Sequence, residues 1–127
     1  MSISADESLD AIRVILATAV MVGFSVLANL LLKYDALSGP EQIRLLGIWG
    51  WRSVAGAASF GIALAGYSLL VRSLPLNVAQ SFATLQFVGV IVASRIILGE
   101  QITSLRLTGI LTILAGITIV SVSRGQP

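Results

Sequence analysis

Long uninterrupted runs of apolar residues dominate the chain. The runs at 14–32 and 53–71 contain no charged residue, and basic side chains flank each run at both ends. At about 1.5 Å per helical residue, each run rises roughly 28 Å, close to the ~30 Å hydrocarbon thickness of a bilayer. Because the runs are apolar on every face, they must be buried in lipid or among other helices. The pattern predicts two membrane-spanning helices.

Two further spans are predicted in the second half of the chain, at 74–98 and 107–123. The last is at the lower end of the length range for a spanning helix. The four spans form one domain over 13–123, an all-α membrane protein with four transmembrane helices and short loops. Residues 1–12 form an acidic tail that lacks the basic start of a cleaved signal peptide, so we expect it to stay attached. Residues 124–127 form a short C-terminal tail.

Composition supports this fold and argues against most enzyme classes. Hydrophobic residues make up 56% of the chain and charged residues 11%, against roughly 25% charged residues in a soluble domain. The absence of cysteine and histidine removes disulfides, thiol nucleophiles, histidine acid–base schemes and most metal sites. We therefore predict no enzyme activity, no catalytic residues, no cofactor and no metal.

The eight Lys and Arg residues, which give a net charge of +2, are scattered singly along the chain. This argues against nucleic-acid binding and favours interfacial anchors at helix ends. Four spans place both termini on one side of the membrane, with three basic residues there. The other side has five: Lys33, Arg44, Arg52, Arg95 and Arg106. The positive-inside rule then places the termini outside, although the small margin also leaves dual insertion open.

Polar side chains interrupt the first span at a helical spacing. Ser25, Asn29 and Lys33 follow one another at i, i+4 and i+8, which puts them along one drifting helix face. One interpretation is a polar groove, closed by the lysine, for a ligand with hydrogen-bonding and anionic groups. The alternative is that these side chains bond neighbouring helices, with Lys33 extending to the lipid headgroups.

The third span contributes a second set of candidate substrate-binding residues. Gln80 and Thr84 share a helix face, and Gln86 lies on another. An amide in lipid must satisfy both its donors and its acceptor, so substrate binding and interhelical bonding are equally good interpretations for the two glutamines, as for Asn29. For Thr84, as for Ser25, interhelical bonding is the favoured interpretation.

Small residues predict close contacts between helices. Ala57, Gly61 and Ala65 form a small-xxx-small row on the second span, and Gly109 and Gly116 lie seven apart on one face of the fourth. Such rows let helix backbones approach closely. Because four helices alone cannot enclose a large polar path, we interpret the face of Gly109 and Gly116 as a contact between subunits.

Acidic side chains are absent from the four predicted spans. A proton-coupled exporter of cations needs a buried carboxylate that exchanges protons with its positive substrate, and the spans offer none. Glu100, in the loop before the fourth span, is expected to cap the N-terminus of the next helix.

Several motifs, in this order, resemble the drug/metabolite transporter superfamily, in particular its four-helix members, the small multidrug resistance proteins and EamA-like half transporters. The motifs are LPLNVA at 74–79, TLQFV at 84–88, LGEQIT at 98–103, TGI at 108–110 and LAGI at 114–117. The resemblance covers nearly the whole chain after the acidic tail. It implies a half transporter of four helices, in which Gly109 and Gly116 lie on a dimer-forming helix.

Two departures separate the chain from the multidrug branch. That branch carries an essential glutamate eight residues before a lysine at the end of the first helix, and the corresponding residue here is Ser25. It also offers a tyrosine and a tryptophan on the third helix, where Gln80 and Ala83 stand here. The segment from Ser25 to Asn29 that leads to Lys33, together with TLQFV at 84–88, instead resembles the paired small subunits that translocate undecaprenyl-phosphate-linked aminoarabinose.

The resemblance implies a transporter subunit that flips a polyprenyl-phosphate-linked sugar or a related lipid across the bacterial inner membrane. Its partners are then membrane lipid, the lipid-linked substrate, and either a second copy in an antiparallel homodimer or a sister four-helix subunit. Two alternatives stay open. One is a proton-coupled exporter of small molecules or cations, of the small multidrug resistance type, and the other is a non-transporting structural subunit of a larger membrane complex.

Overall fold

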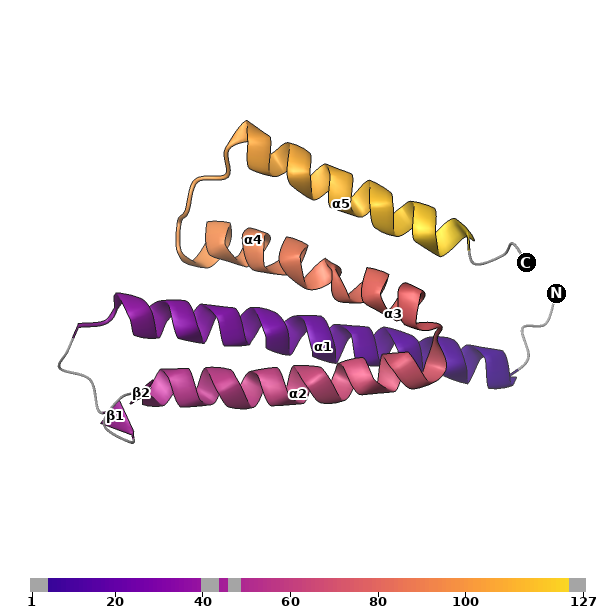
Figure 1. Cartoon of the computed structure of the whole chain (residues 1–127), viewed down its shortest axis with the longest axis horizontal. Coiled ribbons are helices and arrows are strands. Elements are labelled where there is room, and N and C mark those ends of the chain that lie inside the picture. The colour runs from indigo at the N-terminus through magenta and orange to yellow at the C-terminus, as the bar shows by residue number, and fades with distance from the viewer. Residues whose placement is uncertain (1–4, 40–43, 46–48, 124–127) are drawn as a thin grey trace.

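The computed structural model describes residues 5–39, 44–45 and 49–123. Helices α1 and α2 run antiparallel side by side, α3 and α4 follow one another beside α1, and α5 lies outermost (Figure 1). The strands β1 and β2 form a small antiparallel hairpin between α1 and α2, which the apolar pattern does not predict. In chain order the elements are α1 (Ala5–Leu37), β1 (Arg44–Leu45), β2 (Trp49–Gly50), α2 (Trp51–Ser73), α3 (Leu76–Ala83), α4 (Leu85–Ile97) and α5 (Ser104–Val122).

The helices confirm an all-α membrane protein of four apolar segments. α1, α2 and the 22-residue stretch Leu76–Ile97, which contains α3 and α4, are each long and apolar enough to cross a bilayer. The fourth apolar helix, over Ser104–Val120, is shorter. The chain is therefore a multi-pass membrane protein.

Helix α1 is longer than the apolar run that predicts the first span. It begins at Ala5, inside the segment expected to be a tail, and its first turn carries Asp6 and Glu7. Acidic side chains at this position interact favourably with the positive end of the helix dipole. A search for apolar runs does not detect such a polar extension. Because the helix continues beyond the apolar run, the limits of the membrane spans stay predictions.

The third span is a broken helix, since α3 ends at Ala83 and α4 begins at Leu85. At the junction, the Thr84 hydroxyl donates to the carbonyl oxygen of Ser81 at 2.6 Å, and the N–H of Phe87 donates to the carbonyl oxygen of Thr84 at 3.0 Å. A threonine hydroxyl that bonds back to its own helix bends that helix. The hydroxyl of Thr84 is therefore used at the junction.

Helices α1 and α2 pack closely because α2 presents small residues to α1. A Cβ atom on Gly66 would lie 3.0 Å from the carbonyl oxygen of Ala17 and from the backbone nitrogen of Met21. A Cβ atom on Gly56 would lie 3.2 Å from the carbonyl oxygen of Ala28. The buried stripe of α2 recurs every three or four residues, as expected for one helix face: Gly56, Ser59, Ala63, Gly66 and Leu70.

The small-residue row predicted on this helix is wrong as a contact within the described part of the chain. Ala57, Gly61 and Ala65 are all exposed, and a Cβ atom on Gly61 would meet nothing within 4 Å. Small residues mark faces where backbones can approach, but α2 carries two such faces. Only the packing against α1 shows which of them is used.

The loop between α4 and α5 folds back over the end of α4. Gly99 has a φ of 68°, a left-handed conformation that glycine adopts without steric cost, and the N–H of Glu100 donates to the carbonyl oxygen of Ser94 at 3.3 Å. Thr103 caps α5, because its hydroxyl oxygen accepts from the N–H of Arg106 at 3.4 Å. The predicted capping role of Glu100 is therefore wrong: a hydroxyl takes that position, and Glu100 pairs with α1 instead.

Helix α5 packs loosely on the rest of the bundle. Ile110 is buried, whereas Leu105 and Ile119 are 82% and 69% exposed. Cβ atoms on Gly109 and Gly116 would meet nothing within 4 Å. The glycine face that the sequence assigns to a subunit contact is thus uncovered by the described part of the chain.

Candidate functional site

Three cavities with polar groups in their walls lie along α1. The large cavity, about 1190 Å³, borders α1 between Glu7 and Val22. The middle cavity, about 370 Å³, borders α1 at Ser25. The third, about 400 Å³, borders α1 at Asn29 and Lys33 and is called the Lys33 cavity below. Together they follow α1 from one end to the other.

The middle cavity brings together three predicted site residues, Ser25 on α1, Gln80 on α3 and Gln86 on α4. Ser25 is 2% exposed. The side-chain nitrogen of Gln80 donates to the hydroxyl of Tyr67 on α2 at 2.7 Å, which satisfies an amide donor that lipid cannot satisfy. Phe60 adds a second aromatic ring. The cavity is therefore lined by uncharged polar side chains together with two aromatic rings.

The Lys33 cavity gathers charged groups from three segments. Asn29 and Lys33 of α1 meet Ser94 of α4, Glu100 of the loop and Arg106 of α5. The Nζ of Lys33 lies 3.6 Å from the Oε1 of Glu100, and these side chains are 48% and 39% exposed. An ion pair this exposed contributes at most about 1 kcal/mol. The cavity is thus lined by two cationic side chains and by one anionic side chain whose ion pair is weak.

The polar groove predicted along α1 is divided between these two cavities. Ser25 lines the middle cavity, while Asn29 and Lys33 line the Lys33 cavity. Each step of four residues advances about 40° around a helix, so eight residues turn the face by roughly 80°. That drift directs Ser25 toward α2 and α3, and Lys33 toward α4 and the loop. Thr84 lines neither cavity and bonds to Ser81 at the helix junction.

Helix α4 crosses α1 closely at Gly89. A Cβ atom on Gly89 would lie 2.8 Å from the Cγ2 of Val26 and 3.4 Å from the Cγ1 of Val22. Val22 lines the large cavity and Asn29 lines the Lys33 cavity, so the crossing separates these two cavities along α1. Sequence analysis does not select Gly89, because a single glycine in an apolar helix carries no pattern of its own.

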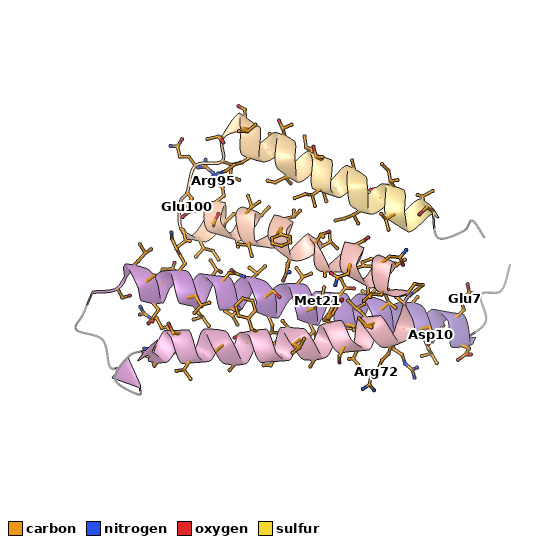
Figure 2. The ribbon with its side chains drawn as sticks, viewed as in Figure 1. Glu7, Asp10, Met21, Arg72, Arg95 and Glu100 are labelled. Atoms are coloured by element: carbon orange, nitrogen blue, oxygen red, sulfur yellow. The ribbon has the colours of Figure 1, made fainter. Side chains whose placement is uncertain are left out.

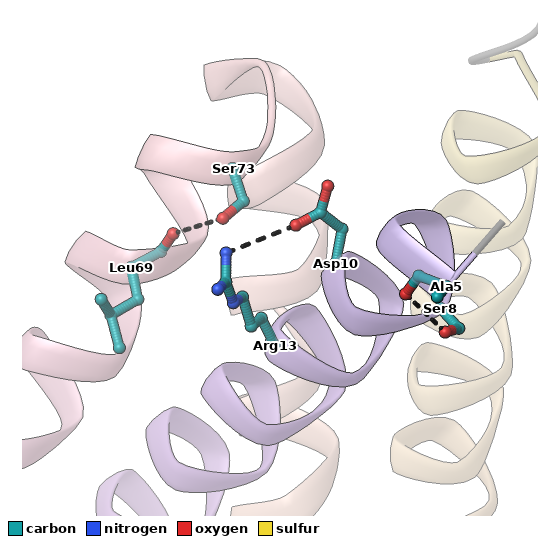
Figure 3. A network of polar contacts seen from close by, with 6 residues as sticks. All are labelled: Ala5, Ser8, Asp10, Arg13, Leu69 and Ser73. Atoms are coloured by element: carbon teal, nitrogen blue, oxygen red, sulfur yellow. Dashed lines mark hydrogen bonds and ion pairs between the residues drawn. The ribbon is translucent and has the colours of Figure 1, made fainter.

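The large cavity has a charged rim and apolar walls. Its rim contains Glu7, Asp10 and Arg13 of α1 together with Arg72 of α2, and Figure 2 shows Glu7, Asp10 and Arg72 at one end of the molecule, opposite Glu100. The Oδ1 of Asp10 lies 3.5 Å from the Nη1 of Arg13, both exposed (Figure 3). Apolar wall residues include Val14, Leu74, Phe82, Leu85 and Val88.

Sequence reasoning misses the large cavity because it treats Arg13 and Arg72 as anchors and the preceding acids as a tail. The signal that reveals it is helical spacing that continues from the tail into the span. Asp10, Val14 and Thr18 are four apart and share a face. Ile15 also lines this cavity and is 65% exposed, so the cavity reaches the outer surface of the bundle.

The three cavities together present groups that an amphiphile with an anionic headgroup could use. Basic side chains line the cavities at both ends of α1, beside acidic ones, and uncharged polar groups lie between them. Lys and Arg are the side chains that pair best with phosphate, and apolar walls suit a hydrocarbon chain. Within residues 5–39, 44–45 and 49–123, no group of three or more His, Cys, Asp or Glu side chains is placed to hold a metal ion.

Comparison with known protein families gives a match that spans nearly the whole chain. The EamA-like transporter family matches residues 2–122, a range that includes every described helix. In comparisons with curated proteins and with solved structures, no significant match was found. Members of the matching family are transporters, in agreement with the long apolar helices of a multi-pass membrane protein. The chain belongs to the EamA-like transporter family, within the drug/metabolite transporter superfamily.

Proposed function

We propose that the chain is a transporter subunit that moves a polyprenyl-phosphate-linked sugar, or a related lipid, across the bacterial inner membrane. The observation that supports this most is the presence of basic side chains in the cavities at opposite ends of α1. Lys33 and Arg106 line one cavity together with Glu100, and Arg13 and Arg72 line another together with Glu7 and Asp10. A phosphate group is anionic at either membrane surface, so it needs cationic partners wherever it enters and leaves.

The headgroup and the tail of such a lipid use different surfaces. Sugar hydroxyls pair with the uncharged side chains of Ser25, Gln80 and Gln86 in the middle cavity. The headgroup then keeps hydrogen bonds while it crosses the apolar layer, where unsatisfied polar groups are costly. The prenyl chain stays in lipid beside exposed apolar side chains such as Phe87 of α4 and Leu111 of α5.

The proposal includes a partner subunit. One chain supplies only part of an enclosing wall, and a Cβ atom on Gly109 or Gly116 would meet no atom of the described residues within 4 Å beyond its own stretch of helix. Small residues allow a second helix backbone to approach closely. A second copy inserted antiparallel, or a sister four-helix subunit, packs on this face and closes the path.

Transport by reconstituted protein tests the proposal. Liposomes that contain the protein should speed the transbilayer movement of a fluorescent short-chain polyprenyl-phosphate sugar, and Lys33→Ala and Asn29→Ala should each slow it several-fold. Asn77→Ala is the matched control, because Asn77 lies outside the three cavities and its side chain accepts, among the described residues, only from the N–H of its neighbour Val78. Unchanged movement in both cavity variants removes the proposed path.

A proton-coupled exporter of small molecules or cations is the second candidate. It is favoured by Phe60 and Tyr67 beside the middle cavity, because aromatic faces attract cations. Vesicles with an imposed pH gradient distinguish the two candidates. Gradient-dependent uptake of a cationic dye supports the exporter, whereas lipid movement without dye uptake supports the lipid transporter.

A further inference from the structure

We propose that Glu100 is a built-in competitor for the phosphate of the transported lipid. The carboxylate of Glu100 pairs with Lys33, and a phosphate-bearing ligand binds in the Lys33 cavity by displacing that carboxylate. The inference rests on the proposed function, because the phosphate of the cargo is the ligand. It goes beyond that function by assigning a negative side chain of the protein to the place that the phosphate takes.

The backbone of the loop holds Glu100 in position for this role. The left-handed turn at Gly99 reverses the chain after α4. The N–H of Glu100 then donates to the carbonyl oxygen of Ser94 at 3.3 Å, and its own carbonyl oxygen accepts from the Nη1 of Arg95 at 3.3 Å. With its backbone held on both sides, Glu100 places its carboxylate 3.6 Å from the Nζ of Lys33.

The charges of the cavity fit an anion that binds two cations. Lys33 and Arg106 are positive and Glu100 is negative, so the three sum to one positive charge. Among the described residues, the guanidinium of Arg106 has one long hydrogen bond, 3.5 Å from its Nη1 to the carbonyl oxygen of Gln101. A phosphate group offers more acceptor oxygens than a carboxylate and can bridge both cations, which the carboxylate of Glu100 does not do among the described contacts.

The weakness of the ion pair makes displacement possible. Both partners are about half exposed, and exposed pairs are held weakly against solvent and competing ions. A fully buried pair would hold its carboxylate in place at a large cost to any competitor. The resident carboxylate also lowers the net affinity for phosphate, so that cargo bound at Lys33 can leave again when Glu100 returns.

Equilibrium binding of farnesyl phosphate tests the proposal. The protein is placed in nanodiscs of a zwitterionic lipid, and titration calorimetry measures the Kd for farnesyl phosphate and for farnesol. Glu100→Gln removes the competing charge and keeps the shape, so its Kd for farnesyl phosphate should fall about two- to fivefold. Asp6→Asn makes the same charge change at the far end of α1, at a residue that lines none of the three cavities, and should change the Kd less than Glu100→Gln does. Circular dichroism and the elution volume confirm that each variant is folded.

A second variant ties the effect to Lys33. In a Lys33→Gln background, binding of farnesyl phosphate should be weaker. Adding Glu100→Gln to that background should not increase the affinity, because the lysine with which Glu100 pairs is already absent. Competition by inorganic phosphate assigns the site to phosphate itself, and binding that requires the prenyl chain assigns it to lipid-linked phosphate. Either result supports displacement of Glu100 only if Glu100→Gln also binds farnesyl phosphate more tightly than wild type does.

The failures of the two proposals are distinguishable. If wild-type protein binds farnesyl phosphate better than farnesol but Glu100→Gln does not tighten that binding, displacement is overturned and the proposed function stands. A gain that persists without Lys33 also overturns it, because the effect is then general electrostatics. If farnesyl phosphate and farnesol bind alike in every variant, phosphate recognition fails and both proposals fall.

Discussion

The carboxylate of Asp35, near the end of α1, lies at the beginning of α2. The hydroxyl of Ser53 donates to its Oδ2, while its Oδ1 is buried without a hydrogen-bond partner among the described residues. Gly50 is the N-cap residue of α2 and has no side chain to cap it, and a Cβ atom there would collide with the Asp35 carboxylate. Asp35 therefore supplies, from another helix, the negative group that favours a helix N-terminus.

Substitutions at Asp35 and Gly50 should be coupled. Asp35→Ala removes the carboxylate and Gly50→Ala displaces it, so each should lower the free energy of unfolding by about 1–2 kcal/mol, through loss of the hydrogen bond from Ser53 and of the negative charge at the N-terminus of α2. In the Asp35→Ala background, Gly50→Ala should cost little, since the collision is gone. Unfolding in mixed detergent micelles measures all three variants. Strictly additive losses would show that Gly50 and Asp35 act independently.

Helical spacing is local, so it predicted that Ser25, Asn29 and Lys33 lie near one another along α1. Over eight residues the face drifts, so that Ser25 lines the middle cavity while Asn29 and Lys33 line the Lys33 cavity. Spacing does not predict which residues from distant segments meet them. Glu100 reaches Lys33 only because the loop turns at Gly99, and no sequence pattern links those positions.

The seam between α1 and α2 depends on glycine at particular positions of α2. Gly66→Val adds side-chain atoms where a Cβ would already lie 3.0 Å from backbone atoms of Ala17 and Met21. Overpacking of this kind should lower stability by about 1–3 kcal/mol. Gly61→Val is the matched control on the same helix, since a Cβ on Gly61 meets nothing within 4 Å. Equal losses of stability in the two variants would place the seam elsewhere.

The lengths of the apolar runs predicted the number and order of the membrane helices, because each helix that crosses the lipid needs a long apolar run. They could not predict the ends of α1, where Asp6 and Glu7 extend the helix by favourable charge rather than by burial. They also missed the break at Thr84, where the hydroxyl donates to the carbonyl oxygen of Ser81. Both features involve polar groups that hydropathy does not record.

The outermost position of α5 gives the protein an uncovered face (Figure 1). If this face binds a second subunit, Gly109→Leu and Gly116→Leu should prevent close approach and abolish association. Ala115→Leu adds the same bulk on a different face of α5, where Ala115 is also exposed, and should leave association intact. Energy transfer between labelled copies in liposomes measures this. Association that survives both glycine variants would assign the subunit contact to another face.

The most direct test of a paired lipid transporter measures movement of a labelled polyprenyl-phosphate sugar across liposomes that contain the protein and any subunit that co-purifies with it. Wild type and Ala115→Leu should accelerate the movement well above protein-free liposomes, and Gly116→Leu should return it to that background while remaining folded. Movement by wild type no faster than in protein-free liposomes, or full movement by a dissociated Gly116→Leu variant, would contradict a transport path that two subunits complete.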